Sequence, residues 1–314
     1  MRIMKTCLIS LVVVLGAAII TAVGFLYLWP EHTATVLIKL ERDRSGLERK
    51  EISLSDGSQY VYLEGGKGEP LMLLHGFGAD KDNFVRVARY LTRHYWVIAP
   101  DHIGSGESTH PIDADYSPRA QAERLRTLAH ALGITNLHLG GSSMGGHIAM
   151  TYAALYPGEV KSLWLIDTGG VWSAPKSELQ RIIKSSDENP LTPRNDDEFA
   201  RMLPFVMSRP PFIPRPILNV MAKQRIANYA LEQRVLKQIA SDSVEQRVSG
   251  LKTPALIVWG KEDRVLNVET AEILHKLLPA SRVIIMAGIG HLPMIEDPKR
   301  SAEDYLAFRA SLKQ

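Results

Sequence analysis

The chain has 314 residues, 45% of them hydrophobic, which is enough apolar material for one large globular domain or two smaller ones. Lys and Arg number 37 against 34 Asp and Glu, and this near balance argues against a protein that binds the phosphate backbone of nucleic acids. The only cysteine, Cys7, excludes an internal disulfide and a zinc site built from cysteines.

The N-terminal stretch "CLISLVVVLGAAIITAVGFLYLW", residues 7–29, contains no charged residue. About 23 residues of helix reach about 34 Å, more than the ~30 Å of a bilayer's hydrocarbon core. We expect residues 1–30 to form an anchor in the cytoplasmic membrane of the cell envelope. Arg2 and Lys5 would stay inside, and the remainder would lie outside the cytoplasm. The alternative is a signal segment that is cleaved before secretion.

From about residue 59, short β-rich runs alternate with helical runs. The predicted strands are 59–64, 70–75, 95–100, 136–141, 160–167, 254–260 and 281–287. The predicted helices are near 82–92, 118–132, 145–156, 268–278 and 298–312. This pattern predicts one α/β domain over residues 31–314, with a mostly parallel central sheet and helices on both faces.

Residues from about 172 to 250 break this alternation, because they contain helical runs and the proline-rich "RPPFIPRP" but no convincing strand. We predict a helical insertion there, the cap segment. Its apolar side chains either line an acyl pocket or attach the segment to the core. They are Met202, Leu203, Phe205, Val206, Met207, Phe212 and Ile213.

The stretch "LHLGGSSMGGHIAM", residues 137–150, contains G-x-S-x-G between a strand and a helix. In that setting the serine occupies a sharp, strained turn that exposes its hydroxyl above the sheet, and the glycines let strand and helix approach closely. A glycine-rich turn without chemistry is the plainer interpretation of the letters alone. The strand and helix on either side favour a nucleophile, which would be Ser143.

A serine nucleophile needs a base, and the base needs an acceptor that fixes its tautomer. Downstream, "WGKEDRV" places Asp263 after one predicted strand, and "GHLPMIEDP" places His291 after the next. Since both follow strands, they are expected at the same edge of the sheet as Ser143. We predict Asp263 as acid and His291 as base, with Asp167 in "LIDTGG" as the alternative acid.

An acyl-transfer site also needs donors for the oxyanion. The backbone N–H of Met144, at the start of a helix, is one candidate. The other is the N–H of Phe77 in "LLHGFGADKDNF", where Phe77 and His75 are also predicted to contact substrate, His75 mainly as an orienting residue. The glycine-rich stretch "PDHIGSGES" lacks the lysine and the spacing of a phosphate-binding loop. We therefore expect Asp101 to hold this turn together.

With these motifs in order, the chain resembles the α/β-hydrolase superfamily. Beyond about residue 40 it is similar to the bacterial triacylglycerol lipases of the cold-adapted Moraxella and Psychrobacter group. The resemblance implies carboxylic-ester hydrolysis through an acyl-enzyme, with triacylglycerols or related acyl esters as substrates. It also implies Ser143, Asp263 and His291 as triad, Phe77 and Met144 as oxyanion donors, and no cofactor or metal.

Two other functions fit the same residues. Carbon–carbon bond hydrolases of the superfamily use the same triad, so the motifs alone do not exclude them. A membrane-tethered binding module without activity is the other alternative, although such proteins often lose a triad or oxyanion element. The sequence therefore predicts a serine ester hydrolase of lipase type, anchored in the membrane through residues 7–29.

Overall fold

The computed structural model describes residues 2–186 and 188–312, with the side chains of residues 2–9, 11, 18–20 and 22 outside that description. Its centre is an eight-stranded sheet in the order β1-β2-β4-β3-β5-β6-β7-β8. The strands are β1 (Glu48–Ser53), β2 (Gln59–Gly65), β3 (Glu69–Leu74), β4 (Tyr95–Pro100), β5 (Leu137–Ser142), β6 (Val160–Ile166), β7 (Ala255–Gly260) and β8 (Ser281–Met286). β2 pairs antiparallel with β1 and β4, and every other pairing is parallel. The predicted mostly parallel sheet is confirmed.

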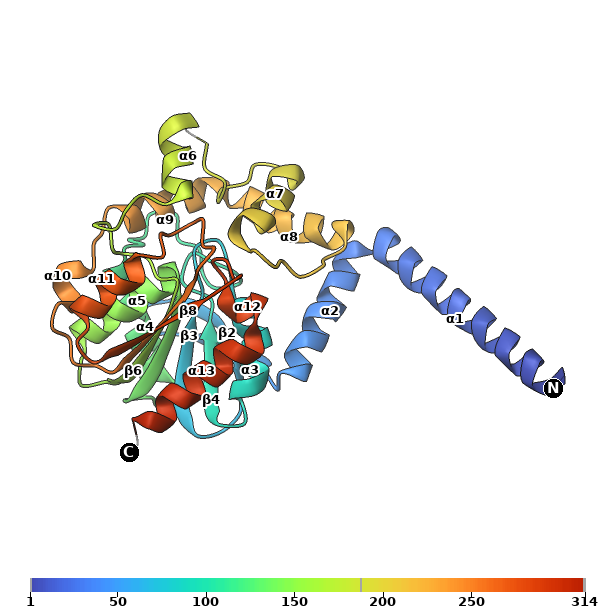
Figure 1. Ribbon diagram of the computed structural model, residues 1–314, viewed down its shortest axis with the longest axis horizontal. Coiled ribbons are helices and arrows are strands. Elements are labelled where there is room, and N and C mark those ends of the chain that lie inside the picture. The colour runs from blue at the N-terminus through green and yellow to red at the C-terminus, as the bar shows by residue number, and fades with distance from the viewer. Residues whose placement is uncertain (1, 187, 313–314) are drawn as a thin grey trace.

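Helices cover both faces of this sheet (Figure 1). On one face lie α4 (Pro118–Ala131), α5 (Met144–Leu155) and α11 (Thr270–Leu277), packed on one apolar cluster. On the other lie α3 (Val85–Leu91), which follows the 3-10 turn η1 (Lys81–Phe84), and α13 (Pro298–Ser311), next to the short α12 (Pro293–Glu296). Because the central strands are covered on both sides, β5 and β7 are buried along their whole length.

Local chemistry fixes where two of these helices begin. The Ser117 hydroxyl accepts the N–H of Ala120, and Pro118 occupies the first turn of α4. Asp297 does the same for α13 by accepting the N–H of Arg300, with Pro298 in the first turn. A side-chain acceptor before the helix satisfies an N–H that has no partner inside it, and proline there loses no hydrogen bond.

The cap segment lies between β6 and β7 in sequence and above the carboxyl edge of the parallel strands in space (Figure 1). It contains α6 (Glu178–Ser186), α7 (Asp196–Val206), α8 (Arg215–Ala227), α9 (Tyr229–Ala240) and α10 (Glu245–Val248). Apart from residue 187, which is outside the description, residues 172–250 contain no strand.

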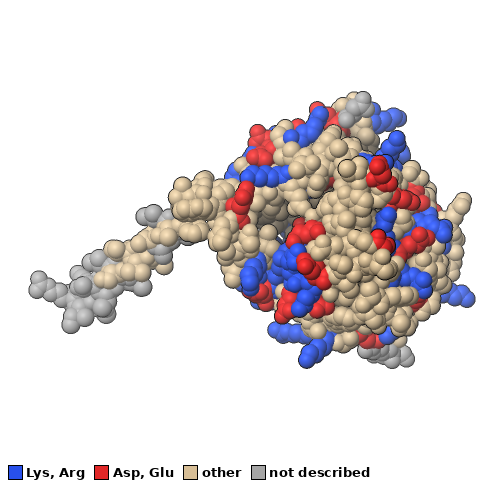
Figure 2. Space-filling model, turned by 180° about the vertical axis from the view of Figure 1, so that it is seen from behind, with Lys and Arg blue, Asp and Glu red and all other residues tan. Residues whose placement is uncertain are grey.

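The N-terminus forms two helices, α1 (Arg2–Leu28) and α2 (Pro30–Arg44), and the second of them is not predicted from the sequence. α2 is tied to the body by ion pairs of Glu31 with Lys223 on α8 (2.5 Å) and of Arg42 with Asp82 on η1 (2.5 Å). α1 extends away from the body (Figures 1 and 2). The predicted anchor, residues 7–29, falls mostly on α1, but the side chains of 7–9, 11, 18–20 and 22 lie outside the described part. Within the described part, no helix is long and apolar enough to cross a membrane.

Trp164 on β6 provides a test of the core. Its fully buried ring stacks on Tyr305 of α13, with centroids 4.6 Å apart. We expect Trp164→Ala to lower the free energy of unfolding by about 3–5 kcal/mol, since the cavity would not collapse. Urea unfolding followed by circular dichroism measures the change. Phe212→Ala is the control, because that ring is 91% exposed and its removal is expected to change stability by less than ~0.5 kcal/mol.

Candidate active site

Ser143 sits on a tight turn between the end of β5 and the start of α5. Its backbone has φ 54° and ψ −116°, a region that a residue with a side chain rarely adopts. Such strain costs of order 1–3 kcal/mol and persists only where neighbouring structure enforces it. Here the N–H of Ser143 donates to the carbonyl of Ile166 (3.0 Å), and its own carbonyl accepts from Gly169 (3.0 Å). The last residue of β6 and the loop after it thus hold the turn through both the N–H and the carbonyl of Ser143.

Glycines on each side of Ser143 allow three backbones to meet. A Cβ added to Gly145 would lie 2.0 Å from the carbonyl oxygen of Leu74 on β3. One added to Gly141 would lie 2.3 Å from the carbonyl oxygen of Gly145. No side chain fits at these distances, so β3, β5 and α5 can be this close only with glycine at both positions.

His291 and Asp263 are brought together from neighbouring loops after β8 and β7. The Nδ1 of His291 lies 2.8 Å from Oδ2 of Asp263, and both side chains are almost completely buried. Asp263 Oδ1 accepts the N–H groups of Val265 and Leu266, which fix the carboxylate. Since a carboxylate only accepts, the imidazole donates from Nδ1 and its Nε2 is left with a free lone pair.

The loop expected to supply the second oxyanion donor passes beside Ser143. A Cβ added to Gly76, the residue before Phe77, would lie 3.3 Å from Cβ of Ser143. Met144, the other predicted donor, is the first residue of α5, where the N–H groups have no intrahelical acceptor. Both predicted donors therefore lie on segments in direct contact with Ser143.

His75 is fully buried against His102, with ring centroids 4.4 Å apart. Its Nε2 accepts the N–H of His102 (3.1 Å), so its Nδ1 carries the proton and donates to the carbonyl of Gly76 (2.8 Å). Burial lowers the pKa of His75 to about 4, which keeps the ring neutral. Both nitrogens are used within the protein, which supports the orienting role, and contact of His75 with substrate stays a prediction.

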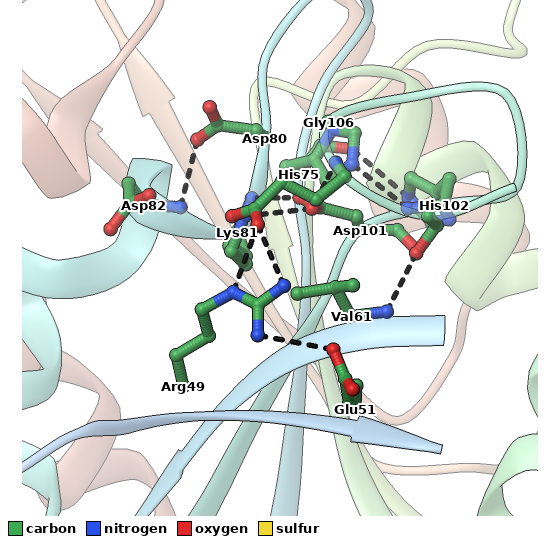
Figure 3. Close-up of polar contacts among 12 residues, drawn as sticks. Arg49, Glu51, Val61, His75, Asp80, Lys81, Asp82, Asp101, His102 and Gly106 are labelled. Atoms are coloured by element: carbon green, nitrogen blue, oxygen red, sulfur yellow. Dashed lines mark hydrogen bonds and ion pairs between the residues drawn. The ribbon is translucent and has the colours of Figure 1, made fainter. Parts of the chain in front are cut away.

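A buried ion pair between Lys81 and Asp101 lies next to the loop that carries His75 (Figure 3). The carboxylate of Asp101 accepts the backbone N–H of Lys81 (2.7 Å), its Nζ (2.8 Å) and the N–H of Glu107 (2.8 Å). Asp101 therefore holds the glycine-rich turn, as the sequence predicts. The burial of Lys81 was not predicted, because its partner lies twenty residues away on another strand end.

The cap segment contacts the site at two points. The N–H of His291 donates to the carbonyl of Val206 at the end of α7 (2.8 Å). The predicted apolar residues Met202, Phe205, Val206 and Met207 are buried in a cluster that includes Val265 and touches Leu292, two residues that neighbour Asp263 and His291 in sequence. Leu203 and Ile213 are partly buried, whereas Phe212 points into solvent.

Arg225 on α8 contacts the loop of Phe77 and Gly78, which is not predicted from the sequence. Its guanidinium lies 5.8 Å from the ring centroid of Phe77, and a Cβ added to Gly78 would lie 2.2 Å from its Cζ. Glu232 (2.5 Å) and the carbonyl of Leu191 (2.6 Å) hold it from within the cap segment. Nothing in the local pattern around Arg225 marks this role, since all its partners are distant in sequence or on another helix.

Comparisons of this chain with a protein-family model, with known relatives and with solved structures agree with one another. A family model described as alpha/beta hydrolase fold matches residues 69–298. Lipase 1 of Psychrobacter immobilis is 44% identical over 290 residues, covering 90% of each chain. Lipase 3 of Moraxella sp. (strain TA144) is 45% identical over 291 residues, covering 90% of this chain and 91% of the relative. The crystal structure of a membrane phospholipase A, a bacterial virulence factor, is 39% identical, covers 99% of both chains and gives a TM-score of 0.88.

The close approach at the turn can be tested at Gly145. We expect Gly145→Ala to force β3 and α5 apart and to lower the free energy of unfolding by about 1–3 kcal/mol or more. Thermal and urea unfolding measure the loss. Gly158→Ala is the matched control, because an added Cβ there meets nothing within 4 Å. Equal stability of the two variants would contradict the close packing described for the turn.

Proposed function

The chain belongs to the alpha/beta hydrolase fold family, and from that premise we propose that it cleaves acyl esters of lipids with Ser143 as nucleophile, His291 as base and Asp263 as acid. It is a lipase-type ester hydrolase, as its 44–45% identity to two bacterial lipases indicates. The observation that carries the residue assignment is the buried hydrogen bond between His291 and Asp263, at the same sheet edge as the strained turn of Ser143.

The mechanism follows from the tautomer of His291. Its free Nε2 takes the proton of the Ser143 hydroxyl as the oxygen attacks the ester carbonyl. The imidazolium is stabilised by Asp263, and the N–H groups of Met144 and Phe77 stabilise the oxyanion. His291 then gives the proton to the leaving alcohol, and water repeats the sequence to release the fatty acid and free Ser143.

We place the acyl chain beside the cap segment, residues 172–250, as part of a hydrolase domain over residues 31–314. The buried Phe199, Met202 and Phe205 of α7 support this, because they belong to a cluster that reaches the loops of Asp263 and His291. The same triad also serves carbon–carbon bond hydrolases, so the choice of substrate decides between the two chemistries.

Ser143→Ala tests the nucleophile. We expect it to lower kcat for ester hydrolysis by roughly 10⁴-fold or more, since the acyl-enzyme cannot form. Ser142→Ala is the neighbouring control, because the buried Ser142 hydroxyl has no hydrogen-bond partner among the described residues, and it should stay active. The substrates are p-nitrophenyl esters of increasing acyl length, an emulsified triacylglycerol and a phospholipid. Unchanged turnover by Ser143→Ala would contradict the nucleophile, and wild-type inactivity on every ester would contradict the ester chemistry.

We further infer that residues 7–29 attach the protein to the membrane with the catalytic domain outside the cytoplasm. The stretch has no charged residue, and the described side chains Val12, Val13, Val14 and Leu15 are 61–66% exposed on α1. The described atoms of this arm carry neither red nor blue in Figure 2. Exposed apolar side chains of this density are unfavourable in water and favourable in a bilayer.

The anchor is tested in the full-length chain by fractionation. We expect it to stay with the membrane pellet after an alkaline carbonate wash, and Val14→Arg with Leu15→Arg to release it, since each Arg at a span's centre costs about 2.5–3.5 kcal/mol. Ile112→Arg, at a site already 77% exposed, should not change the distribution. A mature chain that begins near residue 25 and is found in the medium would instead support the cleaved signal.

A further inference from the structure

A second buried carboxyl group lies beside the acid and the base. Asp167 directly follows β6 and is completely buried. One polar atom each of Asp167, Asp263 and His291 lie within 4.8 Å of one another. This places Asp167 inside the proposed triad, where the mechanism above gives it no role.

The hydrogen bonds around the two carboxyl groups differ. Asp263 accepts three donors, the N–H groups of Val265 and Leu266 and the imidazole of His291. Asp167 accepts a single donor, the N–H of Gly260 on Oδ1 (2.9 Å), and among the described residues its buried Oδ2 meets no donor. An ionised carboxylate needs several donors when it is buried, so the negative charge is favoured on Asp263 and disfavoured on Asp167.

The charged groups that face Asp167 also disfavour its ionisation. Burial raises the pKa of Asp167 well above its usual range, and the negative charge of the nearby Asp263 raises this pKa further. Glu296 on α12 adds a smaller repulsion. Two adjacent carboxyl groups in a dry site share one proton, because their like charges cannot both be accommodated.

The backbone of Asp167 is also strained. Its φ is 42°, and Ser143 is the other described residue besides glycine with positive φ. Its N–H donates to the carbonyl of Val258 (3.0 Å), which fixes the backbone of Asp167 against β7, the strand before the loop of Asp263. Backbone strain of this kind is expected where the position of the side chain serves a function.

We propose that Asp167 is a positioning residue that remains protonated and donates a hydrogen bond from its carboxyl group to the carboxylate of Asp263. The acid side of the triad is then a carboxylic acid and a carboxylate that together carry one negative charge. This inference rests on the proposed function, with Asp263 as the acid of the triad. It gives the alternative acid of the sequence analysis a different role, in which it orients Asp263 and does not bind His291.

Two substitutions separate this role from a purely structural one. In Asp167→Asn the amide N–H still donates to Asp263 and the amide oxygen still accepts from Gly260, so we expect kcat/KM to stay within about tenfold of wild type. In Asp167→Leu both contacts are lost, and we expect kcat to fall by roughly 10–100-fold, as for other residues that orient a catalytic group, with little change in KM. A loss in Asp167→Asn as large as in Asp263→Asn would overturn the proposal, because Asp167 would then be the acid itself.

A double-variant comparison tests the shared proton. In Asp263→Asn the repelling charge is gone, so Asp167 can ionise within 4.8 Å of the imidazole and preserve part of the activity. We expect the pair Asp167→Asn with Asp263→Asn to be at least about tenfold less active than Asp263→Asn alone. Equal activity of these two proteins would contradict the proposal.

A stability measurement tests the protonation without using activity. A carboxyl whose folded pKa is raised stabilises the fold fully below its unfolded pKa, near the ordinary 3.8, and this contribution is lost as pH rises toward the folded value. Between pH 5 and pH 8 we therefore expect Asp167→Asn to gain stability relative to wild type in urea unfolding. Asp113→Asn, at a 90% exposed side chain, should show no such trend. If the stability difference between Asp167→Asn and wild type did not change with pH, the proposal would be overturned. Activity in Ser143→Ala would refute only the proposed function.

Discussion

The contact between three backbones at the glycine-lined turn is the constraint on which the site depends. β3, β5 and α5 meet there without side chains between them, and the turn places Ser143 in a conformation it would not adopt freely. The same contact brings the loop after β3, with Gly76 and Phe77, against Ser143. One local packing arrangement thus fixes the hydroxyl and both segments that carry the predicted oxyanion donors.

The central strands and the order of the motifs could be predicted from the sequence because their signals are local. Continuous apolar runs mark β3 to β7, and glycine spacing marks the turn at Ser143. β1 was not predicted, since "ERKEIS" is mostly polar and this edge strand has only one neighbour. α2 was not predicted either, because its sequence is rich in charge and its contacts are with α8 and η1, far along the chain.

Contacts between polar residues on different helices, strands and loops could not be predicted in the same way. The pairs Lys81–Asp101, Arg225–Glu232 and Asp167–Asp263 each depend on where loops and helices meet in the folded chain. The choice between Asp263 and Asp167 is an example, because both follow sheet strands and the sequence offers no means of counting donors. Among the residues that the structure describes, three donors reach Asp263 and one reaches Asp167.

The hydrogen bond from the N–H of His291 to the carbonyl of Val206 limits how freely the cap segment can be exchanged. A chimaera that carried a foreign insertion between β6 and β7 would have to present a carbonyl oxygen at the same point, or the imidazole's loop would lose an anchor. Modularity of this fold is therefore incomplete: sequence variation in the insertion that moves the end of α7 also moves the loop that carries His291. Compatible insertions should share the backbone geometry at the end of α7 even where their side chains diverge.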